Sequence, residues 1–257
     1  MKKYDKHYTS YNLVKFCCKL FNKYIKVNKN DLVIEPSAGN GAFLKCIKRF
    51  KNILLMDIKP EHSKIKKQNY LKYNYKEIIN KYNNIYIIGN PPFGKKSSLA
   101  IKFIKHSCKF CKSFAFILPK SFEKNSLQKT IPFNFHLIKS VDLPENSFNL
   151  PIKCVFQIWE KMDYDRKKIY KIKPNKNYYF VNKFSNPTVA IRRVGSKAGY
   201  LYYDNIENKN ENTHYFIKIN KKFKKIVKIN IKESKYTLGP NSISKMSIIK
   251  NLNRIII

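Results

Sequence analysis

The chain has 257 residues, of which 53 are Lys or Arg and 16 are Asp or Glu, so its formal net charge is +37. This basic excess predicts a polyanionic partner, for which nucleic acid fits best. Coding in an AT-rich genome also explains part of the charge, because it enriches Lys, Asn, Ile and Tyr together, but attraction to phosphates follows whatever its origin. No apolar run approaches the ~20 residues that span a bilayer, and the N-terminus is unlike a secretory signal. We therefore expect an intracellular protein of the cytoplasm or nucleus that uses no membrane.

Residues 11–159 alternate between helical and strand patterns, which is typical of an α/β sheet. Helical spacing of apolar residues predicts a first helix over 11–27 and later helices over 42–50 and 99–110. The expected strands share short apolar runs bounded by turn residues. They lie at residues 32–34, 53–56, 85–88, 114–118, 135–141 and 153–159. The connection between the last two lacks a helical pattern, so we expect that pair to be antiparallel.

The C-terminal third differs from the rest of the chain in its predicted elements and in its charge. It has short extended stretches at 178–184 and 188–194, and residues 166–257 contain 22 Lys or Arg against 4 Asp or Glu. We therefore expect an α/β domain over 1–165 and a basic substrate-recognition region over 166–257. Within the second stretch, Arg192 and Arg193 are candidates for nucleic-acid binding, because a guanidinium on the solvent face of a strand can contact a phosphate bidentately. An exposed arginine with a structural role is the equal alternative.

The six cysteines show no disulfide spacing for a chain of this size, so they are expected to be reduced thiols. The stretch His106 to Cys111 has no second pair of ligands, and we predict no metal site there.

A glycine turn follows the strand at 32–34. Gly39 and Gly41 let the backbone approach a ligand closely, and the next helix begins with free N–H groups. The third glycine of the dinucleotide fingerprint is absent, which counts against NAD. Asp57, at the end of the next strand, can accept hydrogen bonds from both hydroxyls of a ribose. These features favour an adenosyl group, and an ordinary structural turn is the alternative.

The sequence Asn90-Pro91-Pro92-Phe93 comes directly after the strand at 85–88. Methylation of a ring-conjugated amine requires its lone pair to turn toward an electrophilic methyl, so a catalyst must accept the two amine hydrogens. The side-chain oxygen of Asn90 and the carbonyl of Pro91 can accept them, and the prolines make the loop rigid. Phe93 is expected to offer a flat surface on which a base stacks. A purely structural Asn-Pro-Pro turn is the alternative.

With these motifs in this order, residues 4–162 resemble the class I S-adenosylmethionine-dependent N6-adenine methyltransferases. The resemblance implies a Rossmann-like, mostly parallel seven-stranded sheet with an antiparallel last hairpin, and S-adenosyl-L-methionine as cofactor. It assigns catalytic roles to Asn90, Pro91, Pro92 and Phe93. The cofactor-binding residues that it implies are Tyr8, Thr9, Glu35, Pro36, Ser37, Gly39, Gly41, Asp57, Asn69 and Asn90.

Two of these positions need comment. Tyr8-Thr9 is similar to the family's tyrosine-threonine motif, which packs against the methionine end of the cofactor. Asn69 stands where the family usually has an acid that meets the adenine amine; its amide oxygen can accept the same hydrogen bond, although it is neutral.

The expected function is methyl transfer from S-adenosyl-L-methionine to N6 of adenine in DNA or RNA. Protein-glutamine methyltransferases use the same loop, but they usually have tyrosine in place of Phe93, and the basic composition favours nucleic acid. A catalytically inactive methyltransferase fold that binds nucleic acid is the non-enzymatic alternative. DNA and RNA are equally supported: duplex DNA requires flipping of the target base, whereas a single-stranded RNA site presents it at lower cost.

Overall fold

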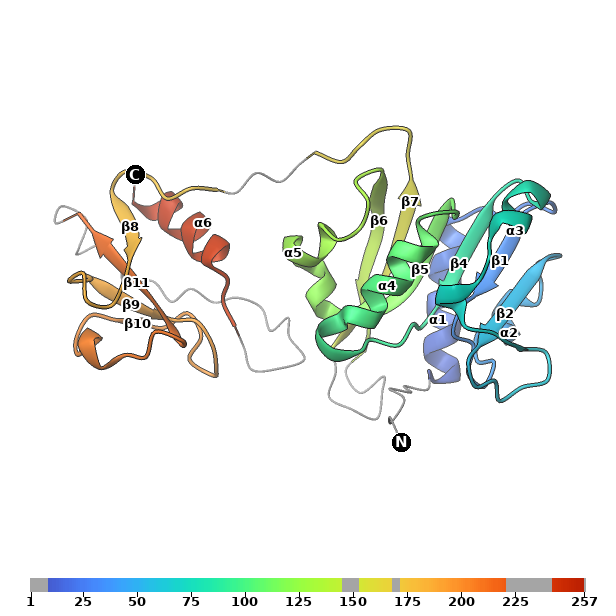
Figure 1. Ribbon diagram of the computed structural model, residues 1–257, viewed down its shortest axis with the longest axis horizontal. Coiled ribbons are helices and arrows are strands. Elements are labelled where there is room, and N and C mark those ends of the chain that lie inside the picture. The colour runs from blue at the N-terminus through green and yellow to red at the C-terminus, as the bar shows by residue number, and fades with distance from the viewer. Residues whose placement is uncertain (1–8, 145–152, 168–171, 221–241, 257) are drawn as a thin grey trace. The chain divides into compact units, whose positions relative to one another are not determined.

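The computed structural model describes residues 9–144, 153–167, 172–220 and 242–256. The chain forms two compact units, Met1–Lys167 and Lys168–Ile257 (Figure 1). The expected boundary at residue 165 lies two residues before this division. Arg166 belongs to the first unit: its guanidinium donates to the carbonyl of Ile131 at 3.0 Å and lies over Trp159. Within the described ranges, no helix is long and apolar enough to cross a bilayer.

The first unit is built on a seven-stranded sheet with the order β3-β2-β1-β4-β5-β7-β6. Its strands are β1 Leu32–Glu35, β2 Ile53–Asp57, β3 Lys66–Lys67, β4 Ile85–Gly89, β5 Ser113–Pro119, β6 Phe135–Asp142 and β7 Cys154–Lys161. The pairs from β3 to β5 are parallel, and β7 is antiparallel to both β5 and β6. This confirms the expected mostly parallel seven-stranded α/β sheet with an antiparallel last hairpin.

The three helices expected in the first unit are shorter than their sequence patterns. The helices of this unit are α1 Tyr11–Tyr24, α2 Leu44–Ile47, α3 Lys76–Lys81, α4 Ser98–Ser107 and α5 Asn125–Gln128, with short 3₁₀ turns η1 Tyr70–Lys72, η2 Lys95–Ser97 and η3 Lys120–Glu123. The side chain of Ser10 caps α1 by accepting the N–H of Leu13, and α1 ends before residue 27 because Ile25 is extended. The helix expected over 42–50 is reduced to α2, which is followed by turns and not by further helix.

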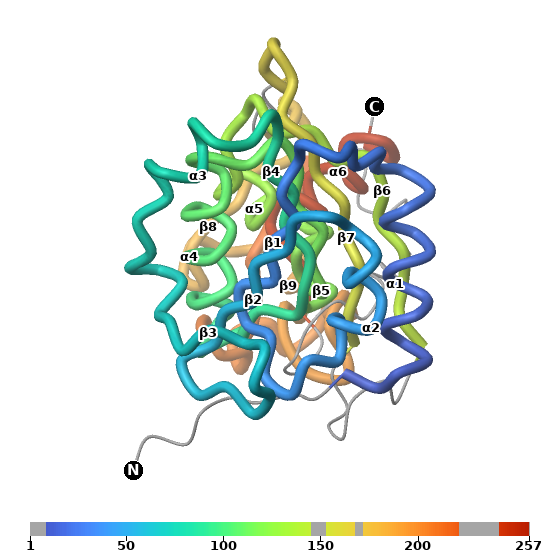
Figure 2. The backbone as a smooth tube through the Cα atoms, turned by 90° about the vertical axis from the view of Figure 1, so that its right-hand side faces the viewer, coloured from blue at the N-terminus to red at the C-terminus, as the bar shows by residue number. Residues whose placement is uncertain are grey.

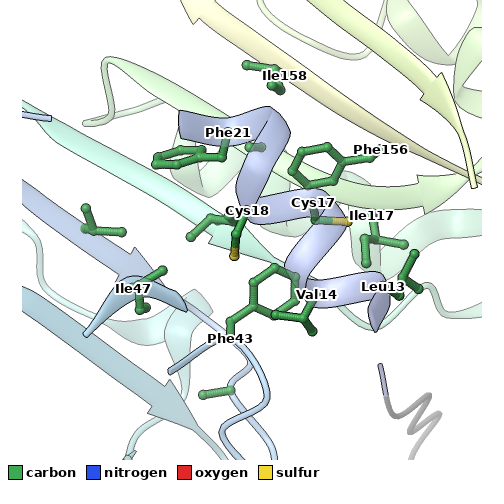
Figure 3. Packing of buried hydrophobic residues seen from close by; sticks show 14 of the residues in the cluster. Leu13, Val14, Cys17, Cys18, Phe21, Phe43, Ile47, Ile117, Phe156 and Ile158 are labelled. Atoms are coloured by element: carbon green, nitrogen blue, oxygen red, sulfur yellow. The ribbon is translucent and has the colours of Figure 1, made fainter. Parts of the chain in front are cut away.

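Two hydrophobic clusters lie on opposite faces of this sheet, since successive strand residues point to opposite sides. Val33 packs with α1 and α2, whereas Ile34 packs with α3 and α4. Figure 2 shows α1 on one side of the strands and α3 and α4 on the other. In Figure 3, Cys17 of α1 lies beside Ile117 of β5 and Phe156 of β7. Burial from both sides explains why the central strands are continuously apolar.

The second unit contains a four-stranded antiparallel sheet with the order β10-β9-β11-β8. Its elements are β8 Tyr178–Val181, β9 Val189–Arg192, β10 Leu201–Tyr202, the 3₁₀ turn η4 Ile206–Asn208, β11 His214–Ile219 and α6 Lys245–Ile255. Helix α6 covers one face through Ile248 and Leu252. On the other face, Ile206 packs against Ala190 and Phe216. This unit therefore has a core of its own.

Candidate functional site

The predicted site residues of the first unit lie at the carboxyl edge of its sheet. Glu35 ends β1, Asp57 ends β2 and Gly89 ends β4. These three strands are parallel neighbours, so their ends lie side by side, which is where open α/β sheets bind ligands.

Asp57 connects the glycine turn to the loop after β2. Its Oδ2 accepts the N–H of Gly39 at 2.8 Å, and its Oδ1 accepts the N–H of Lys59 at 2.7 Å. Gly39 and Gly41 have φ values of 51° and 79°, which other residues adopt only with strain. A carboxylate has about four acceptor positions, so both oxygens of Asp57 can still accept a ligand hydroxyl.

The loop after β2 packs on the glycine turn, a contact that sequence analysis missed. The N–H of Glu61 donates to the carbonyl of Gly39 at 3.0 Å. The side chain of His62 lies 3.7 Å from where a Cβ on Gly41 would be. His62 therefore stands beside the turn. Its position shortly after a strand-terminal acid was the signal that could have found it.

The Asn90 loop is hydrogen-bonded to the segments around it. Ser37 Oγ donates to the main-chain carbonyl of Asn90 at 3.1 Å, and Asn90 Nδ2 donates to Thr9 Oγ1 at 3.1 Å. A Cβ on Gly89 would lie 3.5 Å from the side chains of both Glu35 and Pro36, so the two strand ends approach closely. Three motif segments thus meet here. Tyr8 lies outside the described residues.

The remainder of the loop is packed into the protein. Pro91 is buried and Pro92 is half-buried. Phe93 is 2% exposed within the cluster beneath α1, and its carbonyl accepts the N–H groups of Leu99 and Ala100 at the start of α4. The expectation that Phe93 presents an open stacking surface is therefore not met in this conformation, because the apolar ring is buried with other apolar side chains.

Asn69 also differs from its expected role. It is exposed, and its Oδ1 accepts the N–H of Leu71 at 3.0 Å, so the amide oxygen caps η1. The N–H of Gln68 donates to the carbonyl of Asp57, which keeps this segment beside the end of β2. The residue lies at the expected edge, but its acceptor serves a local turn, as asparagine side chains often do.

Glu35 is the most perturbed acid of the site. It is 2% exposed, and its Oε2 has no hydrogen-bond partner among the described residues. Burial, together with the negative charge of Asp57, raises the pKa of Glu35 to about 8. Burying a carboxyl without a partner is costly, so such a group indicates a place where a ligand completes the interaction.

In the second unit, Arg192 and Arg193 have different surroundings. Arg192 donates from Nε to the carbonyl of Val194 at 2.9 Å and from Nη1 to Thr213 Oγ1 at 3.1 Å, which gives it a structural role. The guanidinium of Arg193 lies over the ring of Tyr215. The two arginines therefore do not act as a pair.

All six cysteines are free thiols. In the part of the chain that the structure describes, no three His, Cys, Asp or Glu side chains gather closely enough to hold a metal ion.

No protein-family model matches the chain, and no curated protein sequence matches it significantly. Several solved methyltransferases resemble it in structure. One is a Listeria monocytogenes protein described as a candidate class I S-adenosylmethionine-dependent methyltransferase, with a TM-score of 0.47 and 16% identity over 63% of this chain and 64% of that one. The tRNA m1G37 methyltransferase of M. jannaschii has a TM-score of 0.45 and 19% identity, covering 62% of this chain and 52% of its own. The methyltransferase subunit of a type I restriction-modification system from Streptococcus thermophilus has a TM-score of 0.46 and 14% identity, covering 70% and 48%. The chain thus spans between 48% and 64% of the length of these three proteins.

Proposed function

We propose that the protein transfers a methyl group from S-adenosyl-L-methionine to the exocyclic N6 amine of adenine in nucleic acid. The observation that supports this most directly is the pair of hydrogen bonds from Ser37 to Asn90 and from Asn90 to Thr9. They join the Asn-Pro-Pro-Phe loop to the glycine-turn segment and to the Thr9 segment at the carboxyl edge of the sheet.

The residues at this edge fit the cofactor. S-adenosyl-L-methionine would supply an electrophilic methyl on a sulfonium, and its amino acid end has an ammonium group. The buried carboxyl of Glu35, whose Oε2 has no partner among the described residues, suits a cationic group, and Asp57 suits the ribose hydroxyls. Gly39 and Gly41 provide a turn without side chains against which the cofactor can lie.

Asn90 and Pro91 are proposed to orient the amine. The side-chain oxygen of Asn90 and the main-chain carbonyl of Pro91 would accept the two amine hydrogens. The nitrogen lone pair would then point at the methyl, so catalysis comes mainly from positioning. Thr9 receives the NH₂ end of the Asn90 amide, which fixes the orientation of its oxygen. Because Phe93 is buried, stacking of the base on its ring would require the ring to leave its cluster when substrate binds.

The net charge of +37 favours a polyphosphate substrate over a protein glutamine. DNA and RNA both satisfy this argument.

Transfer of radiolabelled methyl from S-adenosyl-L-methionine to DNA, capped RNA and uncapped RNA, followed by nucleoside analysis, tests the proposal. Asn90→Ala should lower kcat about 10²–10³-fold, since one group aimed at the developing charge is lost. Asn83→Ala is the matched control, because Asn83 is exposed just before the amino end of β4. Unchanged turnover in Asn90→Ala would contradict the catalytic assignment.

Other outcomes identify the alternatives. Label in protein glutamine, with none in nucleic acid, would favour a glutamine methyltransferase. No calorimetric binding of S-adenosyl-L-methionine at near-millimolar concentration would favour an inactive fold that binds nucleic acid.

A further inference from the structure

Two aromatic rings and two cations meet on the second unit, and we name them the ring-cation cluster: Phe180, Tyr215, Arg193 and Lys245. The rings of Phe180 and Tyr215 lie edge to face, with centroids 6.0 Å apart. Lys245 Nζ is 4.2 Å from the centroid of Phe180, and Arg193 Cζ is 5.2 Å from that of Tyr215. The two rings pack against the hydrophobic cluster that α6 covers. Like Arg193 they are half-buried, and Lys245 is exposed, so part of the cluster is accessible from solvent.

The cluster joins four segments that are distant in the sequence. Phe180 of β8 pairs with Ile217 of β11, so Tyr215 is its diagonal neighbour on the same face of the sheet. The backbone of Arg193 follows β9 and accepts the N–H of Ile243 at 2.9 Å. That bond holds the start of α6, where Lys245 is the first helical residue. Antiparallel pairing and the α6 contact therefore hold rings and cations together.

The electrostatic surroundings of the cluster are positive. In the described residues of the second unit, the acids are Asp204, Glu207 and Glu211, which all lie in the connection between β10 and β11. The other described segments of this unit contain ten Lys or Arg and no acid. The first turn of α6 has no acidic residue, so the partial positive charge of the helix N-terminus adds to Lys245.

Rings beside cations are suited to a chain of unpaired bases linked by phosphates. Aromatic side chains stack on the faces of bases, Lys and Arg neutralise phosphates, and an arginine plane can itself stack. In a duplex the base faces are already stacked on one another, so rings gain nothing from it. An acidic peptide could pair with the cations, but it would not need the rings.

We propose that the ring-cation cluster binds single-stranded nucleic acid, with its rings against unpaired bases and its cations against phosphates. This rests on the proposed function, since it names the form of nucleic acid in which the adenine is presented. The same cluster accepts RNA and DNA strands, because neither stacking nor phosphate contact depends on the sugar.

Binding of the full chain to a fluorescent single strand of mixed sequence, as DNA and as RNA, tests the proposal when it is compared with the matching duplex by anisotropy. A Phe180→Leu, Tyr215→Leu double variant keeps apolar volume and should bind the single strand at least about 10-fold more weakly. An Arg193→Gln, Lys245→Gln double variant should lower the slope of log K against log salt by about 1.4, because two phosphate contacts are lost.

The matched control is Lys250→Gln, Arg254→Gln, which removes the same charge from exposed positions of α6. It should change single-strand affinity less than about 2-fold, since salt screens the attraction between exposed charges and distant phosphates. The conservative pair Phe180→Tyr, Tyr215→Phe retains both rings and should bind like the natural chain. Equal binding by the ring variant and the control, or a duplex preference that the ring variant does not alter, would overturn the proposal.

Loss of folding is distinguished by far-ultraviolet circular dichroism, and the ring-retaining pair separates ring loss from general damage. Cofactor binding and methyl transfer are measured on the same preparations. If methyl transfer occurs and the ring variant binds single strands normally, the cluster proposal fails and the proposed function stands. If S-adenosyl-L-methionine does not bind but single-strand affinity depends on the rings, the proposed function fails and the cluster remains a single-strand site.

Discussion

At the scale of single residues, Glu35 makes stability depend on pH. Burial and Asp57 raise its pKa from 4.5 to about 8 in the folded protein. Between these values the folded protein retains a proton that the unfolded chain has released. The contribution of Glu35 to stability is therefore fully present below about pH 4.5 and is lost as the pH rises to about 8.

We expect Glu35→Gln to become progressively more stable than the natural protein across this window, by at most about 1.4 kcal/mol per pH unit. Urea unfolding at several pH values measures the difference. Glu77→Gln is the control, because it makes the same change at an exposed position on α3. A constant difference for Glu35→Gln would show that Glu35 is ionised in the folded state. The same substitution should weaken cofactor binding, since it removes the carboxyl that is proposed to release its proton when a cationic group binds beside it.

At the scale of elements, the connection from β4 to α4 is held in a strained form. Gly94, Lys96 and Ser97 have φ values of 68°, 52° and 61°, and two of these residues are not glycine. For Lys96 and Ser97 such a conformation costs about 1–3 kcal/mol each and persists where surrounding contacts enforce it. Here the strain lies directly after the Asn-Pro-Pro-Phe motif, and the carbonyl of Phe93 anchors the start of α4. We infer that packing holds the loop in place.

Gly94→Ala tests this inference against Gly39→Ala. Both glycines have positive φ, but a Cβ on Gly94 would lie 2.8 Å from Leu99 Cβ, whereas a Cβ on Gly39 meets nothing within 4 Å. Gly39→Ala should lower the free energy of unfolding by about 1–2 kcal/mol from backbone strain. Gly94→Ala should lower it by about 2–4 kcal/mol, because crowding adds to strain. Equal losses in urea unfolding would show that the loop moves away from the added methyl group with no further loss in the free energy of unfolding.

At the scale of the whole molecule, each of the two units has its own hydrophobic core and a large share of the net positive charge. Each has hydrophobic clusters of its own. Residues 168–257 contain 20 Lys or Arg against 4 Asp or Glu, which is +16 of the total of +37. The first unit keeps the proposed methyl-transfer site, and the second contributes the ring-cation cluster and much of the attraction to phosphates.

A chain ending at Lys167 should therefore unfold cooperatively and bind S-adenosyl-L-methionine as the full chain does. Its affinity for single-stranded nucleic acid should fall at least about 10-fold near physiological salt, with a smaller salt slope, because phosphate contacts and stacking rings are removed. Calorimetry and anisotropy give the two numbers. Loss of cofactor binding in the shortened chain would show that the first unit depends on the second.

Strands buried on both faces could be predicted from the sequence, because a strand between two helical layers is apolar at every position. β1, β4 and β5 are of this kind. β3 consists of two exposed lysines, and only the pairing of Lys66 with Met56 and of Lys67 with Asp57 makes it a strand. β11 was missed because its apolar residues stand near lysines and asparagines, and their burial depends on contact with α6.

By itself, the sequence determined the order of the chemical groups: a glycine turn, the acid Asp57 and the Asn90 loop, each directly after an apolar run. These features are local, so spacing reveals them. Only the tertiary structure decided which groups meet, because hydrogen bonds and burial depend on segments far apart in the chain. It placed Thr9 beside Asn90 across 81 residues and left Glu35 buried. In the structure the side chain of Asn69 accepts the N–H of Leu71, and the ring of Phe93 is buried in the core. The tertiary structure also gave Arg192 and Arg193 different partners: Arg192 bonds to Val194 and Thr213, whereas Arg193 lies over Tyr215 of β11, whose ring contacts Phe180 of β8.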